Sequence, residues 1–201
     1  MADAVLYRQA ATCYEQAGHW ADAARCYRRA GIPLRAAALH ERIGRIDEAV
    51  DDYAEAGEDE IAGWLLVHHL DLPARAREVV RDDAGDSRRA LVLARCDLAE
   101  GRPAALVLPA LARACAELAD ADGVPFPHRD LERWAVTVAE LAGRFDQVAL
   151  IFAAAVTGGR PEARERWAEW ARRVLRTSLV LPDPVQGERT GSAVMEEWWR
   201  V

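Results

Sequence analysis

The sequence predicts an all-α fold: a right-handed α-solenoid of about five helical hairpins that is closed by a C-terminal capping helix. The main indication is a phrase that occurs twice near the start of the chain, with its copies offset by 26 positions. The copies read Gly18-His19-Trp20-Ala21-Asp22-Ala23 with Tyr27 and Ala30, and Gly44-Arg45-Ile46-Asp47-Glu48-Ala49 with Tyr53 and Ala56. We call the interval from Gly18 to Gly44 one period. Self-similarity at a fixed spacing of this size is typical of stacked repeat proteins. Alanine also makes up about a fifth of the chain, and β-branched residues are few, which favours helices over strands.

Glycine and proline punctuation divides the chain into successive predicted helices. We expect them at about 3–17, 20–30, 33–43, 46–56, 59–70, 73–83, 87–100, 103–120, 129–142, 145–157 and 161–177. Four prolines stand at first helical positions, where a missing N–H costs nothing: Pro33, Pro73, Pro103 and Pro161. Pro109 falls inside the eighth helix and is expected to kink or split it. In the third hairpin, Leu70 stands where the turn glycine would be.

The repeated residues are expected to pack the hairpins together. Helices of about ten residues are marginal alone, because isolated helices shorter than about 12–15 residues are barely stable in water. Each must therefore bury one face on its neighbours, with glycine ending a helix and a small alanine seated where two helices touch. The predicted packing residues are Tyr7, Ala11, Tyr14, Gly18, Trp20, Ala23, Tyr27, Ala30, Gly44, Ile46, Ala49, Tyr53 and Ala56.

These residues resemble the tetratricopeptide repeat family over about residues 5–57. Where that family's first helix reads Trp-x-x-Leu-Gly-x-x-Tyr, this chain has Tyr7-x-x-Ala10-Ala11-x-x-Tyr14. The family's turn and second helix are matched by Gly18, Trp20, Ala23, Tyr27 and Ala30, and again by Gly44, Ile46, Ala49, Tyr53 and Ala56. The period from Gly18 to Gly44 is shorter than the family's usual one of about 34 residues, and it implies short helices.

The end of the chain divides into three parts. Helix 161–177 carries one apolar stripe, with Trp167 and Trp170, that would cap the open end of the stack. The expected domains are a tetratricopeptide-like solenoid over 1–177, a linker containing proline and glycine over 178–193, and an acidic-aromatic tail over 194–201. The tail ends in two adjacent tryptophans, which are expected to fold back on the solenoid or to dock on a partner.

Composition excludes several kinds of chemistry. All 26 basic residues are arginine, so there is no P-loop lysine and no Schiff base. The four cysteines form no C-x-x-C pair, and no cofactor or metal set is expected. The longest apolar run, 148–156, is far shorter than the roughly 20 residues that span a bilayer. With no secretory signal at the N-terminus either, we expect a cytoplasmic protein without a membrane partner.

The net charge of −7 is concentrated in one segment. Residues 41–60 hold nine acids and two bases, a balance of −7 for this segment alone. An acidic patch repels phosphate backbones, so we expect no nucleic-acid partner. A basic protein segment suits it better.

The resemblance implies a non-catalytic scaffold or adaptor in a multi-protein bacterial system, which binds a peptide or a partner helix in a groove lined by the first helix of each hairpin. Its oligomeric state is open. The predicted binding residues are Arg8, Thr12, Glu15, Arg35, Leu39, Arg42, Trp64 and His68 in the groove, and Trp198 and Trp199 in the tail.

A small magnesium-dependent enzyme is the alternative. The acid clusters 51–55 and 82–86 resemble the metal-binding clusters of isoprenoid synthases, and two facing clusters could hold a diphosphate through Mg²⁺. Tyr53 inside the first cluster is also a predicted packing residue, which favours the scaffold.

Overall fold

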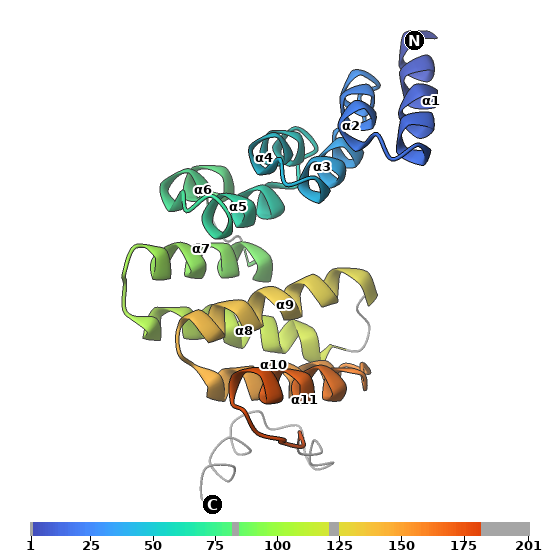
Figure 1. Cartoon of the computed structure of the whole chain (residues 1–201). Coiled ribbons are helices and arrows are strands. Elements are labelled where there is room, and N and C mark those ends of the chain that lie inside the picture. The colour runs from blue at the N-terminus through green and yellow to red at the C-terminus, as the bar shows by residue number, and fades with distance from the viewer. Residues whose placement is uncertain (1, 82–84, 121–124, 182–201) are drawn as a thin grey trace, which may run out of the picture.

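The structure, a computed structural model, describes residues 2–81, 85–120 and 125–181, and every regular element within these ranges is helical (Figure 1). The prediction of an all-α fold is therefore confirmed. The N-terminal half comprises six helices: α1 (Ala2–Gln16), α2 (Trp20–Arg29), α3 (Pro33–Arg42), α4 (Ile46–Glu55), α5 (Asp59–His68) and α6 (Pro73–Val80). Each packs mainly on the helices just before and after it. No described helix has the length and apolar character needed to cross a bilayer.

The turns of the first two hairpins are alike. Gly18 and Gly44 both adopt a left-handed backbone, with φ of 77° and 74°. At each, the next residue donates its N–H to a carbonyl of the preceding helix: His19 to Tyr14, and Arg45 to His40. This is the glycine-based helix ending that satisfies otherwise unpaired carbonyls. It explains why α1 and α3 end within one residue of the predicted positions, at Gln16 and Arg42.

The third hairpin has one extra residue in its turn, which corrects the predicted register. The left-handed residue is Asp71, with φ of 55°, and not Leu70. Helix α6 starts at Pro73, and buried Ala76 and Val80 stand one position later than the period counted from Ala49 and Tyr53 predicts. Neither Leu70 nor Asp71 is a glycine, so the local signal for this turn is Pro73, which begins α6 as predicted.

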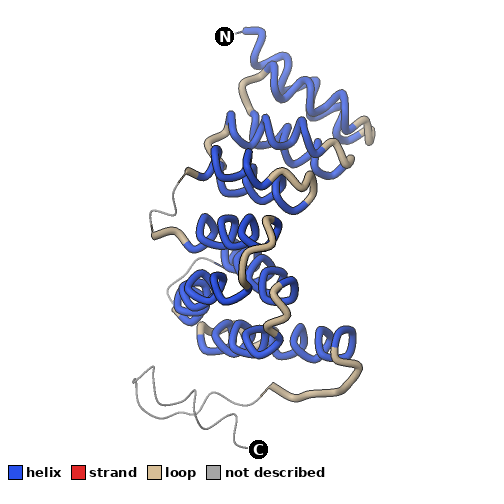
Figure 2. Tube along the Cα trace, turned by 90° about the vertical axis from the view of Figure 1, so that its left-hand side faces the viewer, coloured by secondary structure: helices blue, strands red, loops and turns tan. Residues whose placement is uncertain are grey.

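The C-terminal half contains α7 (Ser87–Ala99), a 3₁₀ turn (Ala104–Val107), α8 (Leu108–Ala119), α9 (Pro125–Leu141), α10 (Phe145–Thr157) and α11 (Ala163–Val174). Pro109 lies in the first turn of α8, so the predicted eighth helix is indeed split. Here helices also pack on non-neighbours, α7 on α9 and α8 on α10. Figure 2 shows the resulting layers along the long axis of the molecule.

The buried apolar residues form two clusters. A small one joins α1, α2 and α3 through Ala11, Ala23, Ala24, Tyr27, Ala36 and Leu39. The large one continues from Ala37 to Leu181 and includes Trp167 and Trp170 of α11. These two indoles stack with ring centroids 5.2 Å apart, and the ring of Trp167 lies 6.1 Å from that of Phe152 in α10. The predicted apolar stripe of helix 161–177 is therefore turned inward.

Most of the predicted packing residues are inside. Ala11, Ala23, Tyr27, Ala49 and Tyr53 are buried, whereas Tyr7, Trp20, Ala30, Ile46 and Ala56 are partly buried. Three of them do not fit the prediction: Gly18 and Gly44 are exposed residues of turns, and 41% of the surface of Tyr14 is exposed. Tyr14 belongs to α1, which packs mainly on α2, so one side of this helix stays uncovered.

Candidate functional site

Four of the six predicted groove residues of α1 and α3 are exposed, and the exceptions are Glu15 and Leu39. Arg8, Thr12 and Arg35 are exposed, and so are the apolar side chains of Val5 and Leu34. We call these five residues the α1–α3 surface. Leu34 stands one period after Arg8, at the same place on its helix. The surface thus combines two apolar side chains with two cations, a mixture that suits an extended peptide or a helix.

Glu15 of α1 connects this helix to α2 and α3. The Tyr27 hydroxyl donates to Glu15 Oε2 over 2.8 Å, and Arg35 Nη2 donates to Glu15 Oε1 over 3.5 Å. The Arg35 guanidinium also lies 5.8 Å from the centre of the Tyr27 ring, within range of a cation–π contact. These contacts hold the Arg35 side chain against α1 and α2.

The hydrogen bond between Tyr27 and Glu15 recurs one period later. There the Tyr53 hydroxyl donates to Glu41 Oε2 over 2.9 Å. Burial, and then the Glu41 carboxylate, raise the pKa of Tyr53, so its hydroxyl stays protonated and remains the donor. This repeated pair was not among the predicted contacts. The sequence does contain a signal for it, since Glu15 and Glu41 are separated by the same period as Tyr27 and Tyr53.

Arg42 is engaged by an aromatic ring. It is exposed, and its guanidinium lies 4.1 Å from the centre of the Trp20 ring, so it joins the end of α3 to the start of α2. A cation–π pair at an exposed site is worth about 0.5–1 kcal/mol. Arg42 therefore makes a structural contact within the protein.

Two predicted binding residues are buried, which corrects their assignment. Leu39 is 6% exposed and packs in the small cluster, and Trp64 is 5% exposed. The Trp64 indole stacks on that of Trp134 in α9, with centroids 4.5 Å apart and planes inclined by 6°. Helix α9 thus fills the place where a partner was expected to reach α5. Nothing in the sequence pattern links two tryptophans that stand so far apart in the chain.

His68 remains exposed at the edge of this aromatic stack. Its ring lies 5.1 Å from that of Trp64 in a stacked arrangement. Burial of the ring lowers the pKa of His68, and the charges of His69, Arg95 and Arg133 lower it further. The lowered pKa favours the neutral form of His68, whose ring extends the flat aromatic surface of Trp64.

The acid cluster 51–55 does not assemble as a metal site. Asp52 is fully buried, and its Oδ2 lies 2.7 Å from His40 Nδ1. Its Oδ1 forms an ion pair with Arg28 Nε at 2.8 Å, without the alignment of a hydrogen bond. Burial is the main reason that the pKa of Asp52 is raised. This carboxyl therefore joins α4 to α2 and α3.

The second acid cluster is only partly described. Residues 82–84 lie outside the described residues, and Asp86 caps α7 by accepting a hydrogen bond from the Arg89 N–H. Within the described ranges, no three His, Cys, Asp or Glu side chains come together in a way that could hold a metal ion.

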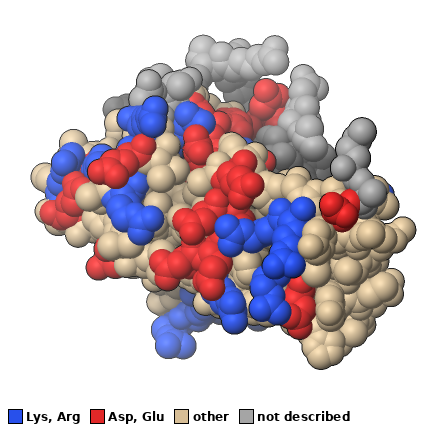
Figure 3. Space-filling view, turned by 90° about the horizontal axis from the view of Figure 1, so that it is seen from above, with Lys and Arg blue, Asp and Glu red and all other residues tan. Residues whose placement is uncertain are grey.

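The exposed acids of the segment 41–60 gather on α4. Asp47, Asp51 and Glu55 are exposed and follow one another at every fourth position, so they share one side of the helix. We call them the α4 acidic stripe. They are on a different helix from the α1–α3 surface. Figure 3 looks down on the α1 end of the molecule and shows acidic and basic side chains lying next to one another over the left and centre of the view.

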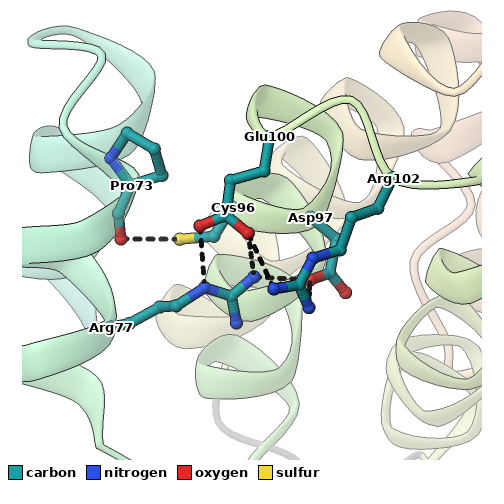
Figure 4. Close-up of polar contacts among 6 residues, drawn as sticks. All are labelled: Pro73, Arg77, Cys96, Asp97, Glu100 and Arg102. Carbon is teal, nitrogen blue, oxygen red and sulfur yellow. Dashed lines mark hydrogen bonds and ion pairs between the residues drawn. The ribbon is translucent and has the colours of Figure 1, made fainter.

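A charged network joins α6 to the end of α7 (Figure 4). Arg77 Nε and Nη2 donate to the two carboxylate oxygens of Glu100, each over 3.1 Å, and Arg102 pairs with Glu100 and Asp97, each at 3.0 Å. Hydrogen bonds from Arg77 are the main cause of the lowered pKa of Glu100. Beside them the Cys96 thiol is buried, which raises its pKa to about 11, so it is protonated at neutral pH. The network is an internal tie between helices.

The tail residues Trp198 and Trp199 lie outside the described residues. Comparison with protein-family models, with curated proteins and with solved structures found no match to this chain.

Proposed function

We propose that the protein is a non-catalytic scaffold of the tetratricopeptide-like α-solenoid type, which binds a peptide or a partner helix of another protein on the α1–α3 surface. The proposal is supported by one observation above all: two successive hairpins have the same tyrosine–glutamate hydrogen bond and the same glycine turn, one period apart. Repetition of this kind builds extended binding surfaces from the first helix of each hairpin.

The chemistry of the α1–α3 surface favours a protein partner. Val5 and Leu34 are 48% and 46% exposed, and each offers an apolar contact beside an arginine. Arg8 has no ion pair within the described part of the chain, so its charge is free to meet a partner's carboxylate. Arginine is enriched in protein interfaces, and an exposed apolar side chain beside it gains from being covered by a partner.

The α4 acidic stripe would serve the approach of the partner. Its three carboxylates attract a basic segment, and rim charges of this kind raise the association rate more than the affinity. We place the protein, as part of the same proposal, in the cytoplasm as one component of a multi-protein bacterial system.

The test is affinity capture from the native host with matched variants. The variant Arg8→Glu/Leu34→Glu changes the α1–α3 surface. The control Arg172→Glu/Leu179→Glu makes the same two exchanges at exposed positions on and after α11. Proteins that are captured by wild type and control but lost with the first variant would support the proposal. Capture that is equal for all three would overturn it.

A further inference from the structure

One side of α1 is exposed although the matching side of α3 is buried. Four residues define this α1 end face, and each has a counterpart one period later, in or just before α3. The pairs are Leu6 with Ile32, Ala10 with Ala36, Cys13 with Leu39, and Tyr14 with His40. Leu6 and Tyr14 are 62% and 41% exposed, whereas Leu39 and His40 are 6% and 2% exposed.

The way in which α3 is covered indicates which kind of helix can pack on the α1 end face. Helix α2 lies against α3 and contributes the small side chains Ala23 and Ala24, with Tyr27, to the cluster that buries Ala36 and Leu39. A helix with a small residue at the crossing point therefore covers this kind of face. On α1, Ala10 is itself such a small residue, with Leu6 four positions before it and Tyr14 four positions after it.

We propose that the α1 end face binds the α1 end face of a second copy of this chain, in an antiparallel dimer with two-fold symmetry. In this arrangement each Ala10 lies near the two-fold axis, where its small side chain lets the helices approach closely. Leu6 of each copy then packs against Tyr14 of the other. Paired in this direction, the pattern Leu-x-x-x-Ala-x-x-x-Tyr places each leucine opposite a tyrosine and the two alanines opposite each other.

Charge also favours a second copy as the occupant. The α1 end face has no charged member, and Figure 3 shows that the side of the view on which α1 lies is largely uncharged. The nearest charge on this side of α1 is Asp3, in the first turn. A rise of about 1.5 Å per residue places the two copies of Asp3 about 20 Å apart, at opposite ends of an antiparallel pair, beyond the Debye length at physiological salt.

The dimer does not rest on the proposed peptide-binding function. Val5, Arg8 and Thr12 of the α1–α3 surface lie on another side of α1 from Leu6, Ala10 and Tyr14, because successive residues of a helix are rotated by about 100°. The dimer and the bound peptide can therefore coexist. An interface built from one helix face is small, so we expect a weak dimer whose population depends on concentration.

Sedimentation equilibrium of the full chain over a wide concentration range tests this proposal. The wild-type mass should rise from 22.2 kDa towards twice that value as the concentration increases. Leu6→Glu should weaken dimerisation at least about tenfold, since it would bury a charge without a partner. The control Val5→Glu places the same charge on the adjacent residue, which is also exposed, and should leave the dimer unchanged. Far-UV circular dichroism checks that both variants keep their helices.

The exposed Cys13 gives a second readout. It belongs to the α1 end face, so its reaction with a thiol reagent should slow as the wild-type concentration rises, and should not slow in Leu6→Glu. A wild-type chain that stays monomeric at every concentration would overturn the proposal. So would a dimer that Leu6→Glu leaves as tight as before.

Discussion

Replacing Gly63 by alanine should destabilise the protein, although alanine is the better helix former. Gly63 lies in the middle of α5, one period after Ala37, which itself stands one period after Ala11. A Cβ added at Gly63 would lie 2.5 Å from Val80 Cγ2 and 3.2 Å from Val92 Cγ1. Carbon atoms in good contact are about 3.5–4.0 Å apart, so α5 and α6 would have to separate by about 1 Å.

Two opposing effects set the magnitude. Helix propensity favours alanine over glycine by about 1 kcal/mol inside a helix. Forcing an extra carbon into a packed core costs about 1–3 kcal/mol. The valine side chains are short and branched and cannot swing away, so we expect the packing cost to be near the upper end of that range. The net result should be a loss of about 1–2 kcal/mol in the free energy of unfolding.

Urea unfolding followed by circular dichroism measures this change. Ala112→Gly, at an exposed position in the middle of α8, calibrates the propensity effect in this chain and should cost about 1 kcal/mol. The double variant Gly63→Ala/Val80→Ala should be more stable than the sum of the single effects predicts, because the shortened Val80 makes room for the new methyl group. If Gly63→Ala instead raised stability by about 1 kcal/mol, the close contact between α5 and α6 would be refuted.

Three further predictions concern packing, the C-terminal helix and pH. Ala49 is fully buried, so Ala49→Leu should lower the free energy of unfolding by about 1–3 kcal/mol, and an unchanged melting temperature would contradict this. Deleting residues 160–201 removes Trp167 and Trp170 and exposes the face of α10 around Phe152, so light scattering should detect aggregation; a soluble monomer of unchanged helicity would disprove the capping role. The raised pKa of Asp52 means that the folded state holds this proton more tightly than the unfolded state, so its contribution to stability falls as pH rises from its ordinary pKa of 3.8 through the higher folded value. The variant Asp52→Asn lacks this proton. As pH rises over that acidic range, the stability of Asp52→Asn measured by urea unfolding should therefore increase relative to that of wild type. A relative decrease with rising pH would show that the folded pKa is lowered.

Local signals predicted the helices well. Gly18 and Gly44 mark helix ends because a left-handed residue without a Cβ is needed there, and both have positive φ. Pro33 and Pro73 begin their helices as expected. The start of α9 at Pro125 lies before the predicted residue 129, because a proline-rich segment looks like a loop although the first turn of a helix tolerates proline.

Long-range contacts could not be predicted in this way. The stacking of Trp64 on Trp134 brings α9 against α5 and removes Trp64 from the expected binding residues, yet it follows from no period in the sequence. The pairing of His40 and Asp52 is similar, since the residues one period earlier are Tyr14 and Cys26. The repeated contact of Tyr27 with Glu15 and of Tyr53 with Glu41, by contrast, could have been found from spacing.

Selection from a displayed random-peptide library tests most directly whether the α1–α3 surface binds other proteins. The library is selected on the wild-type protein, and the enriched peptides are then measured against Arg8→Glu/Leu34→Glu and against the control Arg172→Glu/Leu179→Glu. We expect enriched peptides to lose at least about tenfold in affinity for the first variant and to bind the control as they bind wild type, since one buried apolar contact and one ion pair together exceed about 1.4 kcal/mol. A library that yields no enriched peptide, or peptides that bind all three proteins equally, would contradict the proposed function.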